Sequence, residues 1–186
     1  MDKQACDFLK KLVAIPTPSG FEQDGMRLIA SYLQKNGVKG ARFDVHGNLT
    51  AALNEKAPVR VMIEGHCDEI GFLVQYIDEN GFLYMCADGG VTPQTLAGER
   101  VIIKGRKGDV NGVFGVKPPH LLKASERDKV APAEMSDIAV DIGAANRKEA
   151  EALVELGAPA VVDAGWRPLA NDRVACRGFD DRIGAF

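Results

Sequence analysis

The sequence predicts an α/β protein whose two ends form one domain and whose middle forms a smaller, inserted antiparallel β domain. Two helical patterns open the chain, short alternating runs separated by glycines fill its middle, and strand-like sequence followed by a helix start closes it. The predicted α/β domain covers residues 1–69 and 160–186, and the predicted β domain covers 70–159. A chain of 186 residues can bury one full core or two small ones.

The first elements are two amphipathic helices joined by a stiff loop. Apolar residues recur at helical spacing over residues 2–14, where Asp2 is available as the N-cap and Pro16 ends the pattern. Pro16 and Pro18 restrict the backbone of the following loop. A second run of apolar residues at helical spacing over 26–33 predicts the second helix.

The strand-like segments are short and bounded by turn residues. A histidine–glycine pair at 46–47 predicts a tight hairpin between strands at 42–45 and 48–53. The apolar run at 59–63 predicts a buried strand, and the charged segment 123–129 predicts a loop or flap. In the middle of the chain the predicted strands are 72–77, 82–86, 100–104, 110–114 and 138–142.

The last third returns to helix and strand. Asn146 and Glu149 have the spacing of a capping box and predict a helix that begins there. Short strands are predicted at 161–162 and 173–176. Residues 182–186 have the pattern of the first turn of a helix.

Composition and charge exclude several classes of partner. The chain has 23 basic and 26 acidic residues, a net charge of -3 and no long run of either sign, so neither nucleic acid nor a membrane surface is an expected partner. Four cysteines lie far apart without a C-x-x-C pair, which favours reduced thiols. No apolar stretch approaches the ~20 residues of a membrane span, and the N-terminus lacks the features of a signal peptide. We therefore expect a cytoplasmic protein.

Two acidic clusters carry the residue types of a metal site. His66 follows the apolar run at 59–63, and on an extended segment it shares a face with Asp68, which could accept a hydrogen bond from the imidazole of a metal ligand. The second cluster, Asp180 and Asp181, offers carboxylates, and a carboxylate can bridge two cations. Each cluster also has a simpler interpretation: a solvated turn around His66, and helix capping by Asp180 and Asp181.

Two further residues have two interpretations each. His120, after two prolines, is either a loop residue held by local hydrogen bonds or a group that approaches an active site from the inserted domain. Cys67 is either a small packing residue or, if the strand is distorted, a thiolate ligand.

Four motifs in order along the chain resemble one known family. The sequences PTPSGFE at 16–22, EGHCDEIGF at 64–72, KPPHL at 117–121 and FDDRIG at 179–184 are similar to the signatures of the cytosolic dinuclear metalloaminopeptidases. That family includes the glutamyl and deblocking aminopeptidases, some of which are labelled cellulase M or endoglucanase. The resemblance implies an incomplete mixed-sheet metallopeptidase domain with an inserted β domain.

The resemblance also implies roles for individual residues. His66 would ligate one of two divalent metal ions, and Asp68 would be the catalytic residue that orients His66. Asp180, followed by a cis peptide bond, would bridge both ions. Zinc is the expected metal, with cobalt and manganese as alternatives. The family's catalytic glutamates and remaining ligands would lie beyond Phe186. The inserted domain would help dimers to assemble into a tetrahedral dodecamer.

Three functions remain open from the sequence. The first is a metal-dependent aminopeptidase that removes N-terminal residues from peptides, with the 186-residue chain alone expected to be inactive. The second is an inactive truncated fragment that serves as an assembly or scaffold module. The third keeps the metal site but acts as an amidohydrolase on acyl-amino acids or on another substrate, such as a carboxypeptidase substrate or a glycan.

Overall fold

The computed structural model describes residues 2–122, 132 and 134–185, and it divides the chain into two compact units. The terminal unit comprises Met1–Glu69 and Gly165–Phe186, and the barrel unit comprises Ile70–Ala164. The predicted partition placed its second boundary five residues earlier, between 159 and 160. The loop predicted at 123–129 lies outside the described residues.

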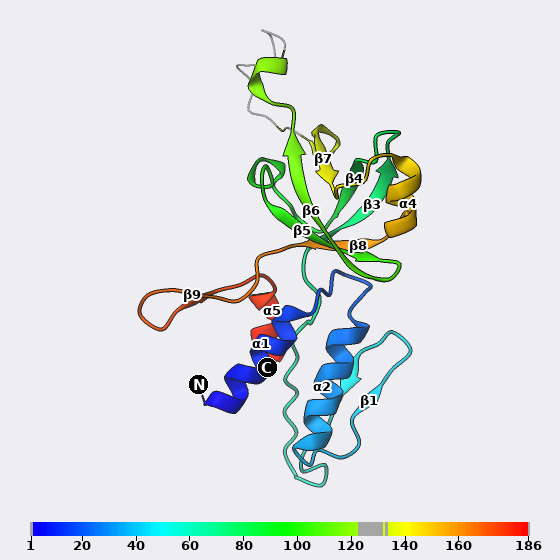
Figure 1. Cartoon of the computed structure of the whole chain (residues 1–186). Coiled ribbons are helices and arrows are strands. Elements are labelled where there is room, and N and C mark those ends of the chain that lie inside the picture. Colours follow the sequence, from blue (N-terminus) through cyan, green and yellow to red (C-terminus); the bar gives the residue numbers. More distant parts are fainter. Residues whose placement is uncertain (1, 123–131, 133, 186) are drawn as a thin grey trace. The chain divides into compact units, whose positions relative to one another are not determined.

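The barrel unit is a closed antiparallel barrel of strands in the order β3-β4-β7-β6-β5-β8 (Figure 1). The last of them, β8, pairs with both β3 and β5 and so closes the barrel. This pairing explains why the unit extends to Ala164 rather than ending at 159. The strands are β3 (Gly71–Ile77), β4 (Leu83–Asp88), β5 (Arg100–Gly105), β6 (Gly108–Val116), β7 (Ile138–Asp141) and β8 (Pro159–Val162).

Alternating side chains fill the barrel interior, as period-two strands require. Phe72 and Phe114 lie in this core with their ring centroids 5.0 Å apart. A shift of register between Val74 and Tyr76 lets Val74 and Ile77 both turn inward, although they are three residues apart. The core is therefore continuous around the barrel.

A short helix and three 3-10 turns complete the described part of the barrel unit. Helix α4 (Arg147–Leu153) begins as predicted, because the Asn146 side chain accepts a hydrogen bond from the Glu149 backbone N–H at 3.1 Å. The Glu149 carboxylate reaches back to the N–H of Ala145 at 3.0 Å. The 3-10 turns are η1 (Pro93–Thr95), η2 (Pro119–Leu121) and η3 (Met135–Asp137).

The terminal unit contains the two predicted helices, α1 (Lys3–Ala14) and α2 (Gln23–Lys35). Asp2 caps α1 through a 2.8 Å hydrogen bond from the N–H of Ala5. The apolar face of α1 is buried, and Phe8 stacks on Tyr32 of α2 with a centroid distance of 3.9 Å. Within the described part of the chain, none of the helices has the length and apolar character needed to cross a lipid bilayer.

Two short hairpins and a C-terminal helix make up the rest of the terminal unit. The predicted hairpin is present but shorter, as β1 (Arg42–Phe43) paired with β2 (Leu49–Thr50). The two-residue strand β9 (Arg167–Pro168), which the sequence analysis missed, pairs with β10 (Val174–Ala175). Helix α5 (Phe179–Ala185) begins three residues before the predicted helix start.

The prediction of a strand at 59–63 is wrong. The segment has no strand conformation, and its side chains are exposed, from 75% for Val59 to 86% for Ile63. A strand needs a neighbour for its backbone N–H and C=O groups. Among the described residues none pairs with this segment. Apolar composition alone therefore did not determine its structure.

Candidate metal site

The terminal unit brings His66 and Asp180 together, although one follows the 59–63 segment and the other lies in α5. The His66 Nε2 atom lies 3.3 Å from Asp180 Oδ1. On the other side of the ring, Nδ1 lies 2.9 Å from Asp68 Oδ1. The His66 side chain is 55% exposed and that of Asp180 is 98% exposed, so the pair is open to a ligand from solvent.

Asp68 is held in place by a second hydrogen bond. The Ser19 hydroxyl donates to Asp68 Oδ2 at 2.5 Å, while Oδ1 faces His66. When Asp68 accepts the proton of Nδ1–H, the lone pair of the ring is on Nε2, the atom that faces Asp180. Ser19 and Asp68 thus orient the imidazole toward the position where a metal ion would bind.

The charges of the site shift the pKa values of His66 and Asp68 in opposite directions. Partial burial lowers the pKa of His66, but the hydrogen bond and charge of Asp68 and the charge of Asp180 outweigh it, so the pKa of His66 is raised. The hydrogen bond from Ser19 lowers the pKa of Asp68, burial opposes this, and the bond to His66 adds to it, so the net shift is downward. A proton therefore competes with any metal ion for His66.

Asp180 and Asp181 have different surroundings at the start of α5. Their peptide bond is cis, as the resemblance implies, and both residues have non-helical backbone angles. The Asp181 carboxylate accepts a hydrogen bond from the N–H of Gly184 at 3.0 Å, so Asp181 takes the capping role. The Asp180 carboxylate extends toward His66 instead.

The segment before His66 packs directly on the backbone of α5. A Cβ atom at Gly65 would lie 2.5 Å from the nitrogen of Ala185 and 2.6 Å from the carbonyl carbon of Gly184. Only glycine allows this approach. This contact holds the residue next to His66 against α5, the helix that contains Asp180.

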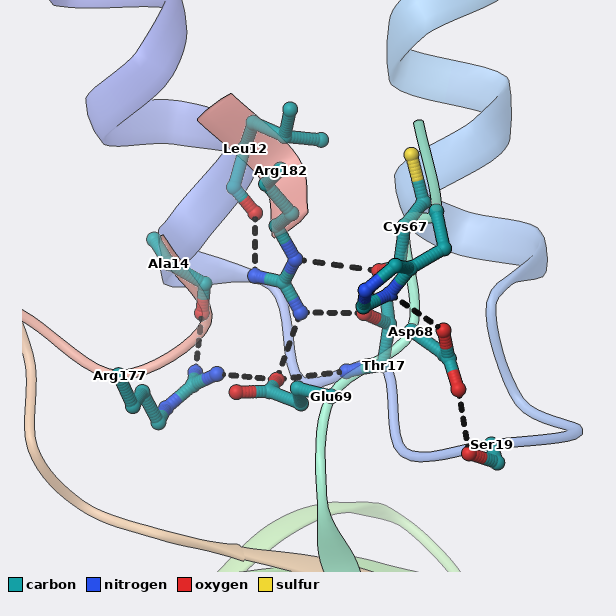
Figure 2. A network of polar contacts seen from close by, with 10 residues as sticks. Leu12, Ala14, Thr17, Ser19, Cys67, Asp68, Glu69, Arg177 and Arg182 are labelled. Atoms are coloured by element: carbon teal, nitrogen blue, oxygen red, sulfur yellow. Dashed lines mark hydrogen bonds and ion pairs between the residues drawn. The ribbon is translucent and has the colours of Figure 1, made fainter. Parts of the chain in front are cut away.

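A buried cluster of charged residues that the sequence analysis did not predict lies against the carbonyl of Cys67, the residue after His66 (Figure 2). Glu69 is 6% exposed and Arg182 is fully buried, and they form an ion pair of 2.7 Å. Both residues lie inside the matched motifs, beside the predicted ligands. No local pattern distinguishes them from surface charges, because their partners come from distant segments.

The other candidates have simpler roles. Cys67 is buried, and burial raises the pKa of its thiol despite the opposing charge of Arg182, which favours packing over thiolate coordination. His120 belongs to the barrel unit, in η2. Its approach to an active site stays a prediction.

The donors of the site fit a divalent metal ion by their chemistry. An imidazole nitrogen and a carboxylate oxygen are ligands that zinc, cobalt and manganese accept. Two donors are fewer than the four of a typical zinc site. Among the described residues, no group of three or more histidine, cysteine, aspartate or glutamate side chains is arranged to hold a metal.

The fold of this chain is similar to that of solved aminopeptidase structures. The crystal structure of the TET aminopeptidase from the marine sediment archaeon Thaumarchaeota archaeon SCGC AB-539-E09 has a TM-score of 0.90 and 35% identity, over 98% of this chain and 51% of that one. A Pyrococcus horikoshii TET1 peptidase, described as able to assemble into a tetrahedron or a large octahedral shell, has a TM-score of 0.80 and 34% identity, over 96% and 52%.

Sequence comparison gives the family. The pattern described as M42 glutamyl aminopeptidase matches residues 47–186, and the chain belongs to this family. The lysyl aminopeptidase of Pyrococcus furiosus is 34% identical over 178 residues, which are 95% of this chain and 51% of that protein. The chain thus spans about half the length of the relatives it matches. The predicted family and the α/β fold class are confirmed.

Proposed function

We propose that the protein to which this chain belongs is a metal-dependent aminopeptidase that removes N-terminal residues from peptides. The observation that carries this proposal is the 3.3 Å approach of His66 Nε2 to Asp180 Oδ1 in a chain of the M42 family. Imidazole and carboxylate donors that converge on an open surface are the ligand types of a catalytic metal centre. The relatives named as aminopeptidases support the reaction class.

The residues of the site have distinct tasks in this proposal. The Nε2 atom of His66 and the carboxylate of Asp180 would hold the divalent ions. Asp68, oriented by Ser19, holds the imidazole in the tautomer that leaves Nε2 free. The metal ions would supply Lewis-acid chemistry at the peptide carbonyl and activation of water. Zinc is the proposed metal, with cobalt and manganese as alternatives.

The site needs further residues to be complete. His66 and Asp180 supply two donors, which do not hold two ions tightly. We therefore propose that the remaining ligands and a glutamate that acts as general base come from outside the described residues. This is consistent with a chain that spans half the length of its relatives. Alone, the 186-residue chain would then be inactive.

The barrel unit is proposed as an assembly domain. The relative from Pyrococcus horikoshii forms a tetrahedron or an octahedral shell, and its structure covers both units of this chain. By analogy, we propose a cytoplasmic homo-oligomer built from dimers into a dodecamer, with peptides as substrates.

A chelation assay on the protein tests the proposed reaction. Hydrolysis of aminoacyl substrates should stop when a chelator removes the metal, and zinc or cobalt should restore it. His66→Ala should abolish activity, whereas His46→Ala should retain it, because His46 lies in the exposed β1–β2 turn of the same unit. Hydrolysis that resists chelation, or survives His66→Ala, would reject the proposal.

The same assay separates the alternatives. Faster hydrolysis of acyl-amino acids than of free-amino-terminal peptides would favour the related amidohydrolase. Absence of both activities, together with absence of bound metal, would favour an inert assembly module.

A further inference from the structure

The guanidinium of Arg182 is fully buried and contacts several segments at once (Figure 2). Its Nε atom donates to the Cys67 carbonyl at 3.1 Å, and one terminal nitrogen donates to the Leu12 carbonyl at 3.1 Å. The other terminal nitrogen donates to Glu69 at 2.7 Å and to the Thr17 hydroxyl. One side chain of α5 is thus bound to the end of α1, to the following loop and to the His66 segment.

The bond to Cys67 acts on the segment that carries the predicted ligand. Cys67 lies between His66 and Asp68, so fixing its carbonyl fixes the peptide from which both side chains extend. The Thr17 hydroxyl donates to the same carbonyl at 2.7 Å, which gives it two donors. This carbonyl is therefore held more firmly than one in an ordinary exposed loop.

Glu69 extends the connection to the loop that orients Asp68. Its carboxylate accepts a hydrogen bond from the N–H of Thr17 at 3.1 Å, and its own N–H donates to the Thr17 carbonyl at 3.0 Å. Ser19, two residues further along, donates to Asp68. The cluster of Arg182, Thr17 and Glu69 thus holds both the segment of His66 and the loop whose Ser19 orients Asp68.

At its other end Arg182 anchors the start of α5. It lies two residues after Asp180, and its guanidinium packs against the backbone at Gly178, where a Cβ would come within 2.9 Å of Nη1. Gly178 has a φ of 71°, a backbone conformation suited to glycine. The Arg182 side chain, two residues after Asp180, therefore packs against Gly178, two residues before it.

The cluster is costly as a source of stability alone. Glu69 also accepts from Arg177 at 2.5 Å, so two guanidinium groups share one carboxylate away from solvent. Burying charges in this way often contributes less to stability than well-packed apolar side chains would. A role in fixing geometry accounts for the cluster better than a role in stability.

We propose that Arg182 is a positioning residue that sets the distance between His66 and Asp180. It does so by tying the carbonyl between His66 and Asp68 to the helix start that carries Asp180. The positioning itself does not depend on the proposed function. Only its purpose, the binding of a divalent metal, rests on that function.

The first test measures zinc binding to the protein by calorimetry, well below its melting temperature. Arg182→Met should weaken zinc binding about 10- to 100-fold, the range seen when residues that support metal ligands are removed. Arg182→Lys keeps a charge beside Glu69 but cannot make the bonds to Cys67 and Leu12 together. We expect it to recover part of the melting temperature while zinc binding stays weak.

A matched control separates positioning from general destabilisation. Leu9→Ala removes a buried side chain of α1, 2% exposed, that takes no part in the hydrogen bonds and ion pairs described above for Arg182 and Glu69, and it should lower the melting temperature without changing zinc affinity. Unchanged zinc affinity in both Arg182 variants would overturn the proposal. So would an equal loss of affinity in Leu9→Ala. If Arg182→Met does not fold, Arg182→Lys carries the test.

A second measurement does not depend on metal. In crystals of metal-free Arg182→Lys, the His66 Nε2 to Asp180 carboxylate distance should exceed the 3.3 Å of the native chain, or the two side chains should lose a single conformation. An unchanged distance would overturn the inference even if the protein binds zinc. Conversely, a native protein that binds no zinc would reject the proposed function, while a changed distance would still support positioning by Arg182.

Discussion

Gly65→Ala tests whether close packing of the His66 segment on α5 stabilises the terminal unit. The new Cβ would lie 2.5 Å and 2.6 Å from backbone atoms of Ala185 and Gly184, where ordinary contacts begin at 3.4 Å. The backbone must therefore move by roughly 1 Å, and overpacking of this kind costs about 1–3 kcal/mol. Because both atoms belong to the backbone of α5, a change of rotamer cannot relieve the clash.

The matched control is Gly165→Ala in the same unit, where a Cβ meets nothing within 4 Å and φ is not positive. Both substitutions lower the entropy of the unfolded chain equally, by about 0.4–1 kcal/mol, so this effect cancels in the comparison. Gly65→Ala should then be less stable than Gly165→Ala by about 1–3 kcal/mol.

Urea denaturation followed by tryptophan fluorescence measures this difference. Trp166 is the one tryptophan of the sequence and lies in the terminal unit, where it contacts Phe179 of α5. With a slope of about 2 kcal/mol per molar urea, the midpoint should fall by about 0.5–1.5 M relative to the control. Equal midpoints for the two variants would refute the packing argument.

Two further predictions concern the charges of the terminal unit. Glu69→Gln removes the carboxylate shared by the buried guanidinium of Arg182 and the partly buried one of Arg177, and it should lower the free energy of unfolding by about 3–5 kcal/mol. Glu155→Gln, at an exposed ion pair of the barrel unit, should change it by less than about 1 kcal/mol. Equal effects in urea titrations would contradict the assigned burial. In the metal-free protein, the raised pKa of His66 stabilises the fold fully below pH 6.5, and this contribution is lost as pH rises through the raised value. Asp68→Asn should lower the pKa of His66 in an NMR titration and reduce that loss, and an unchanged pKa would mean that the contact with Asp68 is absent in solution.

The predictable parts of the fold are those with local causes. Asp2 and Asn146 cap their helices as expected, because capping depends on a side chain and an N–H only a few residues away. The strands of the barrel unit followed from alternating sequence between glycine turns. These patterns do not depend on the rest of the molecule.

The parts that were missed depend on distant partners. The apolar segment at 59–63 is not a strand, since no described strand pairs with it. The second boundary was placed too early, because β8 joins the barrel through pairing with β3 and β5. The buried pair of Arg182 and Glu69 was not predicted, because only folding brings their partners together.

The candidate site was predicted in part from its own residues. Histidine and aspartate two apart on an extended segment indicated the hydrogen bond that the structure shows between His66 and Asp68. The role of Asp180 as a metal ligand came from resemblance, because its local sequence alone favours helix capping. In the structure Asp181 takes that capping role.

The central claim is that His66 and Asp180 together bind a divalent metal ion. Anomalous diffraction from crystals of the protein grown with zinc, recorded on both sides of the zinc absorption edge, tests it most directly. We predict a peak about 2.0–2.2 Å from His66 Nε2 and from a carboxylate oxygen of Asp180. Ordered zinc elsewhere in the protein, with no peak between these two side chains, would contradict the claim.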